Sequence, residues 1–175
     1  MIRELKFKWL TQRYSDEIYR FVRGMLKDPA EAEDATQEIL LRLWQHLPEV
    51  RLSTSRAWLY QTARNYCRDL LRRRQAKHRP LYLGDDETPE PVCDRQSKAT
   101  AESDLTRLRN LLDEALDQLP EAQRSVFVLY EINRLRYQEI ADTLDIPINS
   151  VKVYLSRARQ KLQSLLKEEK SWIDA

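Results

Sequence analysis

The 175-residue sequence contains very little glycine and cysteine. Gly24 and Gly84 are its only glycines, so neither a GxGxxG motif nor a P-loop for nucleotide phosphates can be formed. A sheet-rich fold would need glycine at many turns, and the scarcity of glycine therefore favours helices. Cys67 and Cys93 are too few for a disulfide framework and lack metal-ligand spacing, which fits a reducing interior.

Histidine is also scarce, neither sign of charge is in clear excess, and long apolar runs are absent. His46 and His78 lie far apart without clustered partners, so we expect no metal site, no catalytic residue and no cofactor. Thirty basic against 28 acidic residues leave a net charge of +2, so nucleic-acid binding must depend on where the charges lie. No apolar run approaches the ~18 residues of a membrane span, and no signal peptide is evident. We therefore expect a soluble, cytoplasmic protein without membrane insertion.

Apolar residues recur at helical spacing over about residues 5–76, which predicts three helices around a small core. The second helix is expected to begin after Asp28, with Pro29 at its first position and Glu31 closing a capping box. The third is expected over about residues 54–77. Its inward face would carry Leu59, Ala63, Tyr66, Cys67 and Leu70.

The composition changes between the two ends of the chain. Residues 79–102 hold three prolines and a run of acids, which is typical of a flexible acidic linker. Beyond it, a short helix, a three-residue turn and a longer helix form a helix-turn-helix arrangement. Four helices are expected there, over about residues 103–119, 121–132, 137–144 and 148–168. The predicted fold class is all-α, with two small helical domains, residues 1–78 and 103–175, joined by the linker.

One face of the last helix is suited to a DNA major groove. It lies opposite an apolar stripe through Val151, Leu155 and Leu162. Amide and basic groups there can bind base edges and phosphates, and an apolar side chain can contact a thymine methyl. The alternative is an ordinary solvated face. The candidate duplex-reading residues are Asn149, Lys152, Val153, Ser156, Arg157 and Gln160.

The third and second helices also carry distinctive surfaces. Cations beside an aromatic ring can hold phosphates and stack unpaired bases, and the outer face of the third helix presents Trp58, Gln61, Arg64, Asn65, Arg68 and Arg72. The alternative is a salt-bridged surface with the tryptophan partly buried. On the second helix, Leu41 lies outside the expected core stripe, which consists of Ala32, Ala35, Ile39, Leu43 and Leu47. One exposed leucine needs no explanation. An exposed leucine surrounded by acids and amides resembles a small protein-docking patch, and the neighbours of Leu41 are Asp34, Gln37, Glu38 and Gln45.

Several segments resemble a known family. DPAEAEDATQEILLRLW (28–44) and RAWLYQTARNYCRDLLRRR (56–74) resemble the second conserved region of sigma-70-type factors. The segment from LDQLPEAQ to RARQKL (116–162) resembles their fourth region. The order of the matches, with only a short linker between them, is similar to the extracytoplasmic-function (ECF) group.

The resemblance implies an alternative sigma factor that binds core RNA polymerase and directs promoter recognition and transcription initiation, without being an enzyme. The second helix would dock on the β′ clamp helices, and the β subunit is a further implied partner. The third helix would bind the −10 element as single-stranded DNA, together with loop residues Arg51, Ser53, Thr54 and Arg56. The last helix, including Ser150, would read the −35 element as duplex. An anti-sigma factor is a candidate partner, and the protein in holoenzyme would be nucleoid-associated.

The chain departs from the family pattern in three places. The family often has a glycine and a small capping residue before the helix at 137–144, where this chain has the sequence NRLR (133–136). A missing N-cap typically costs ~1 kcal/mol, so another group must satisfy that helix end. Asn149 stands at a usual glycine position, and Val153 and Tyr154 replace a commoner Ser-Arg pair.

Two other classes of protein fit part of the sequence. An ordinary helix-turn-helix regulator, with an N-terminal half that senses a ligand or dimerises, would bind duplex operators without polymerase. A small nucleic-acid enzyme is disfavoured because the sequence has no cluster of acids, metal ligands or nucleophiles.

Overall fold

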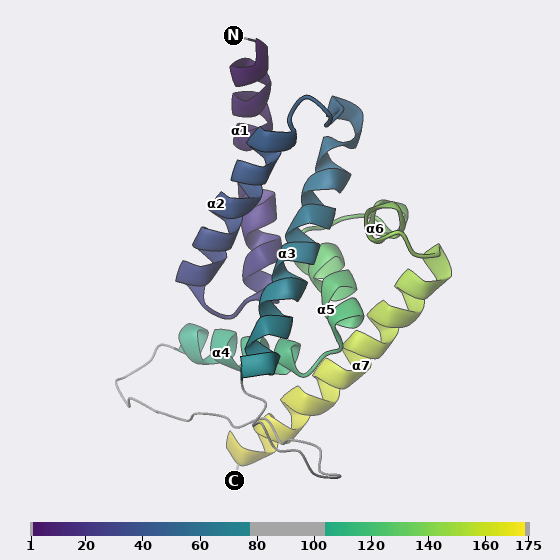
Figure 1. Cartoon of the computed structure of the whole chain (residues 1–175). Helices are drawn as coiled ribbons and strands as arrows, with labels where there is room; N and C mark the ends of the chain where they lie inside the picture. Colours follow the sequence, from purple (N-terminus) through teal and green to yellow (C-terminus); the bar gives the residue numbers. More distant parts are fainter. Residues whose placement is uncertain (1, 78–103, 174–175) are drawn as a thin grey trace, which may run out of the picture.

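The computed structural model describes residues 2–77 and 104–173, and every regular element within them is helical, as predicted. The predicted linker and Cys93 lie outside the described residues. The N-terminal half contains α1 (Ile2–Met25), α2 (Pro29–His46), the 3-10 helix η1 (Leu52–Thr54) and α3 (Ser55–Lys77). The C-terminal half contains α4 (Asp104–Asp117), α5 (Glu121–Phe127), the π-helical turn η2 (Val128–Ile132), α6 (Tyr137–Leu144) and α7 (Ile148–Ile173) (Figure 1).

The start of α2 follows from its sequence. The Asp28 carboxylate accepts the backbone N–H of Glu31 at 2.9 Å, and Pro29 takes the first helical position, where no N–H is needed. The Glu31 carboxylate, which we expected to complete a capping box, pairs with Arg74 of α3. The predicted core stripe of α2 is buried throughout: Ala32, Ala35, Ile39, Leu43 and Leu47.

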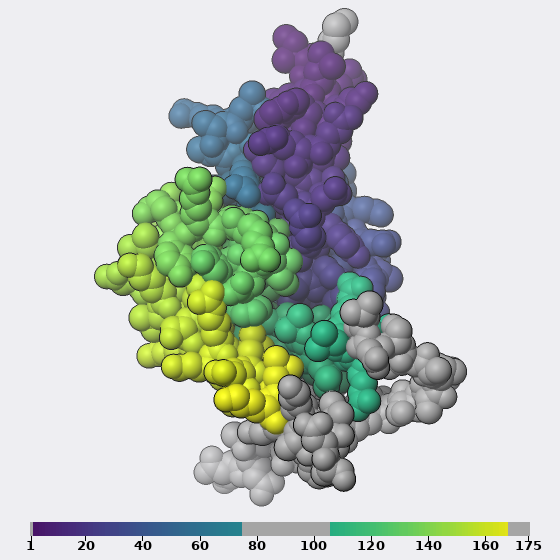
Figure 2. Space-filling view, turned by 180° about the vertical axis from the view of Figure 1, so that it is seen from behind, coloured from purple at the N-terminus to yellow at the C-terminus, as the bar shows by residue number. Residues whose placement is uncertain are grey.

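A shared core joins the two halves, which the sequence did not predict. Buried side chains of α1, α2 and α3 form one continuous cluster with those of α5, η2, α6 and α7. Figure 2 shows α1 in purple lying directly against the green helices of the C-terminal half. A second, smaller cluster packs α4 on α7. The predicted domains are therefore packed together rather than separated.

The C-terminal end of α1 makes the closest contact between the halves. A Cβ on Gly24 would lie only 2.8 and 2.9 Å from the two Cγ atoms of Val128 in η2, so glycine is what allows this approach. Beside it, the buried Arg124 donates to the Met25 carbonyl at 3.1 Å and pairs with Asp117 at 2.9 Å. Burial lowers the pKa of Arg124, and Asp117 opposes that effect. A side chain of the C-terminal half thus caps α1, whose last carbonyls lack helical donors.

Among the residues that the structure describes, four ion pairs connect the halves, and in each the N-terminal half supplies the cation. Their N···O distances range from 2.5 to 2.8 Å. They are Arg23–Asp113, Lys27–Asp117, Arg56–Glu139 and Arg64–Glu121. Partly exposed pairs of this kind contribute little stability individually. Their common polarity, however, makes the two facing surfaces electrostatically complementary.

The Gly24–Val128 contact can be tested with a double-mutant cycle. We expect Gly24→Ala to cost about 1–3 kcal/mol of overpacking, offset by up to about 1 kcal/mol from the better helix propensity of alanine. Truncating Val128 to alanine should make room for the new methyl group, so that Gly24→Ala becomes neutral or stabilising in that background. Urea unfolding of the four proteins measures the coupling, and a coupling near zero would contradict the contact.

Candidate nucleic-acid interface

The helix-turn-helix is formed by α6, the turn at 145–147 and α7. Asp145 ends α6 in a left-handed conformation, with φ of 53°. The Pro147 carbonyl then accepts the backbone N–H groups of Ser150 and Val151, which starts α7. The inward stripe of α7 is buried at Val151, Leu155, Ala158 and Leu162. This packing fixes which side of α7 faces outward.

The predicted duplex-reading face of α7 is open in the structure. Val153 is 44% exposed, and Ser150, at the start of the helix, is half-buried. The other five predicted residues are exposed: Asn149, Lys152, Ser156, Arg157 and Gln160. Three of these, Lys152, Ser156 and Gln160, line a shallow pocket between α7 and the start of α6. The face therefore carries the donors and acceptors that base edges require.

Arg159 borders this pocket at the edge of the face, outside our predicted set of base-reading residues. Its guanidinium donates two hydrogen bonds to one Glu131 oxygen, at 2.6 and 3.0 Å, and lies 5.3 Å from the centre of the Tyr130 ring. Tyr130 in turn stacks on Tyr137. The hydrogen bonds that Arg159 donates to Glu131 raise the pKa of this arginine. Because Glu131 lies 28 positions away, local helical periodicity contained no sign of this pairing.

The unusual segment 133–136 has a structural explanation. Asn133 is buried and donates to the Glu17 carbonyl at 2.7 Å and to the Tyr60 hydroxyl at 3.0 Å, both in the N-terminal half. Arg134 occupies the left-handed region with φ of 58°. Arg136, the N-cap residue of α6, makes no side-chain capping bond, but the Glu139 carboxylate accepts its backbone N–H at 2.8 Å and so satisfies one donor at this helix end.

The structure divides the predicted −10 residues into two groups. Eight lie outside the inter-half contacts described above. Among them, Arg68 is half-buried, and Trp58 is half-buried with its ring 6.1 Å from that of His46. Arg51, Ser53, Thr54, Gln61, Asn65 and Arg72 are exposed. Arg56 and Arg64 instead form ion pairs with the C-terminal half. The salt-bridged alternative thus describes Trp58, Arg56 and Arg64 in this arrangement.

Cys67 of α3 is fully buried, as predicted for a small core residue. Burial raises the pKa of its thiol to about 12, and nearby Arg124 opposes that effect. The thiol is therefore protonated at neutral pH and unsuited to nucleophilic chemistry. Among the described residues, no group of three or more His, Cys, Asp or Glu side chains could hold a metal ion. None of the helices described is long and apolar enough to cross a membrane.

The α2 residues predicted to form a docking patch lie mostly at the surface. Leu41 is 50% exposed, with Asp34, Gln37 and Gln45 exposed nearby on the same helix. Glu38 is half-buried and pairs with Arg42 at 3.0 Å. The patch therefore combines an accessible apolar side chain with carboxylates and amides.

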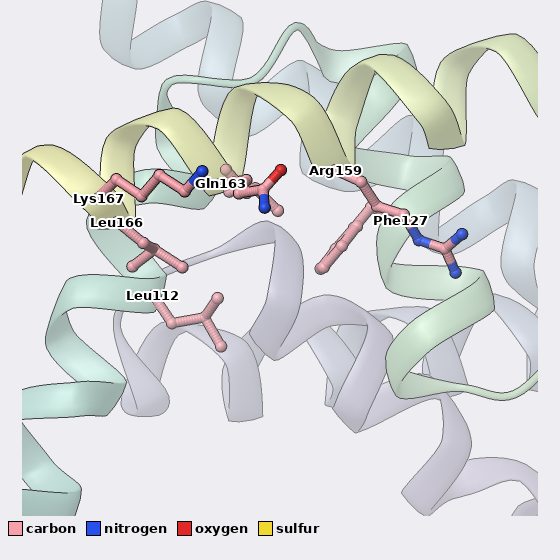
Figure 3. A pocket seen from close by; sticks show the side chains of 7 residues that line it. Leu112, Phe127, Arg159, Gln163, Leu166 and Lys167 are labelled. Atoms are coloured by element: carbon pink, nitrogen blue, oxygen red, sulfur yellow. The ribbon is translucent and has the colours of Figure 1, made fainter.

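An apolar groove between α4, α5 and α7 was not predicted. Figure 3 shows Leu112 and Leu166 on its two sides, Phe127 farther along it, and polar side chains of α7 nearby. Seven residues line it: Leu112, Phe127, Arg159, Leu162, Gln163, Leu166 and Lys167. Leu162 belongs to the predicted inward stripe of α7 and is buried, whereas Leu112 and Leu166 are half-buried, so the groove is open at the surface.

An outward-facing helix-turn-helix, joined to a second helical half with basic and acidic faces, defines a class of DNA-binding transcription protein. Residues 10–77 match the family model for Sigma-70 region 2, and residues 109–162 match that for Sigma-70, region 4. The chain is 30% identical to the ECF RNA polymerase sigma factor SigM of Bacillus subtilis, over 88% of this chain and 91% of that protein. It is 33% identical to SigL of Mycobacterium tuberculosis, over 91% and 88% of the two chains. The chain belongs to the ECF RNA polymerase sigma factors, which are alternative sigma factors that direct transcription initiation.

Two solved structures share the fold. One is the sigma factor RpoE in complex with the anti-sigma factor NepR from Bartonella quintana, with a TM-score of 0.67 and 22% identity over 92% of this chain and 96% of that chain. The other is CnrH in complex with the cytosolic domain of CnrY, with a TM-score of 0.65 and 24% identity over 93% and 88%. Both similarities extend across the two halves of the chain.

The strained turn before α6 yields a stability prediction. A left-handed conformation costs an L-residue roughly 1–2 kcal/mol, and glycine avoids this cost. Glycine also increases the conformational entropy of the unfolded chain, which lowers stability by about 0.4–1 kcal/mol and offsets part of the gain. We therefore expect Arg134→Gly to raise the free energy of unfolding by about 0.5–1 kcal/mol. Arg134→Ala is the matched control, because it removes the same exposed side chain and keeps the strain. Equal urea midpoints for the two variants would refute the explanation.

Proposed function

We propose that the N-terminal half, residues 1–78, binds core RNA polymerase and the −10 element, and that residues 103–175 bind the −35 element, with 79–102 as the linker. The observation that carries this proposal is that α2 and α7 present two different open surfaces on one chain. Leu41 lies among acids and amides on α2, while α7 exposes base-reading groups. A simple operator-binding regulator would need only the second surface.

The α2 patch supports docking to the β′ clamp helices. Exposed Leu41 supplies an apolar anchor, and Asp34 and Glu38 supply charges that favour a basic partner surface. A few well-packed side chains carry most of the affinity of a protein interface, and polar groups around them set orientation and exclude water. Gln37 and Gln45 complete the proposed contact set.

The loop and α3 support capture of the opened strand. Positive and amide groups can follow the phosphate backbone, while Trp58 supplies a surface for stacking an unpaired base. Extruding a base costs a few kcal/mol, which such contacts help to offset. With the two halves packed together, Arg56 pairs with Glu139 and Arg64 pairs with Glu121. Their use in DNA binding therefore requires these pairs to exchange for phosphates.

A second protein partner would bind the C-terminal half. The apolar groove between α4, α5 and α7 offers a second protein-binding surface, for which the β subunit and an anti-sigma factor are the candidates. The mechanism requires binding and positioning only, so no catalytic residue or cofactor has a part in it. Action on polymerase and DNA implies a cytoplasmic protein that is nucleoid-associated in holoenzyme.

The docking proposal is tested with core polymerase. Wild-type protein should allow core enzyme to start transcripts on DNA that neither component recognises alone. Leu41→Ala/Asp34→Ala should weaken binding to core enzyme by at least tenfold, the loss expected when an interface anchor worth more than about 1.4 kcal/mol is removed. Fluorescence titration against core enzyme gives the affinity, and circular dichroism verifies the helical fold.

Leu5→Ala/Asp16→Ala is the matched control for this test, because it removes an exposed leucine and an exposed acid from α1 instead. The control should bind core enzyme as wild type does. Unchanged affinity of the α2 variant, or an equal loss in both, would rule out this docking surface. Specific duplex binding without any transcription would favour the operator-binding regulator.

The α7 assignment predicts separable effects on sequence preference and affinity. A lysine contacting guanine discriminates bases by ~1–3 kcal/mol, and an apolar contact favours the thymine methyl. Lys152→Ala should therefore change preference at one or two upstream positions, and Val153→Ser should relax a thymine preference. Arg159→Ala, at the edge of the face, should weaken all sequences alike. Selections on randomised upstream DNA decide this, and identical base preferences for wild type, Lys152→Ala and Val153→Ser would exclude base readout by this face.

A further inference from the structure

The loop between α2 and α3 is an exposed segment held at both ends. Residues 51–54 are all exposed, whereas Val50 and Ser55 on either side are buried. The loop is also closed internally, because the Thr54 N–H donates to the Arg51 carbonyl at 3.1 Å and the Ser55 hydroxyl donates to the Leu52 carbonyl at 2.8 Å. These internal bonds hold the segment together as one unit, so its orientation depends on how its two ends are held.

Lys6 of α1 fixes the first end. Its ammonium donates to the Leu47 carbonyl at 2.8 Å and to the Val50 carbonyl at 2.6 Å. Leu47 is the C-cap residue of α2, and Val50 immediately precedes the exposed segment. Hydrogen bonds from a charged donor are roughly twice as strong as neutral ones. One partly buried cation thus joins the end of α2 to the base of the loop.

Arg3 provides a natural comparison on the same helix. It donates to the Trp44 carbonyl at 2.8 Å, and its guanidinium lies 4.6 Å from the centre of the Trp44 ring. Both cations therefore bind carbonyls near the C-terminal end of α2, where positive charge is stabilising. Lys6 alone of the two bonds to the loop base at Val50. Figure 1 shows the first turns of α1 beside this end of α2 and the loop that follows.

We propose that Lys6 is a positioning residue for −10 recognition, which sets the loop at residues 51–54 in the orientation that reads the opened strand. This inference rests on the proposed function of that loop. A base reader must be held within a fraction of an ångström of its productive position. The four exposed residues have few anchors of their own, so a fixed point at Val50 determines where Arg51 and Ser53 are presented to DNA.

The experiment measures −10 preference in reconstituted holoenzyme. Lys6→Met keeps the aliphatic stem and removes the donor, whereas Arg3→Met removes a cation from the same helix end without affecting the loop base. Each holoenzyme transcribes a promoter library randomised over the −10 element, below the unfolding temperature of every variant, and the starting transcripts are sequenced. Lys6→Met should reduce discrimination between preferred and non-preferred bases by roughly three- to tenfold, a part of what one good base contact provides.

Three further proteins make the result decisive. Lys6→Arg should largely restore discrimination, because a guanidinium can also donate to both carbonyls. Arg3→Met should retain the wild-type preference, and equal losses in Arg3→Met and Lys6→Met would overturn the inference in favour of simple helix capping. Arg51→Ala/Ser53→Ala tests the loop itself. If the loop variant changes the −10 preference and Lys6→Met does not, the inference about Lys6 is overturned and the proposed role of the loop stands. If neither variant changes the preference, the proposed role of the loop is overturned as well.

Discussion

The close approach of α1 to η2 determines how the two halves of this protein are related. Gly24 allows the backbone of α1 to approach the Val128 side chain, and Arg124 fixes the position by donating to the Met25 carbonyl at the end of α1. Apolar packing alone has little directional preference. A buried guanidinium, by contrast, is costly unless its partners are in place. The Met25 carbonyl and Asp117 therefore make this register more favourable than a slipped one.

A polar network extends this register to the far side of the interface. Asn133 bonds the Glu17 carbonyl and the hydroxyl of Tyr60, which is completely buried. Burial, assisted by the charge of Glu17, raises the pKa of Tyr60, so its hydroxyl remains neutral and available as a hydrogen-bond partner. The residue that departs from the family pattern at 133 thus has a specific partner in the N-terminal half. The turn before α6 contributes to the contact between halves as well as to the helix-turn-helix.

The interface affects the three proposed binding surfaces unequally. The exposed faces of α2 and α7 take no part in the ion pairs between the halves, so the proposed docking and duplex-reading residues remain accessible. The face of α3 differs, because two of its arginines are already paired across the interface, Arg56 with Glu139 and Arg64 with Glu121. A guanidinium paired in this way has fewer donors left for phosphate. The relation between the halves therefore bears mainly on the strand-binding surface.

Helical periodicity and capping act within a few residues, so the amino-acid sequence was enough to predict the helices and both the inward stripes and the open faces of α2 and α7. Leu41 and Val153 were correctly placed at the surface, and Ala32 and Leu155 in the core, by this local rule. The sequence motifs also indicated the family. Only the tertiary structure decided that Arg56 pairs with Glu139, 83 positions away, and that Lys6 holds a loop 44 positions away. Such partners are brought together by packing of the whole chain, and a cation at a given helical position has the same local pattern whether it meets a carboxylate, a carbonyl or DNA.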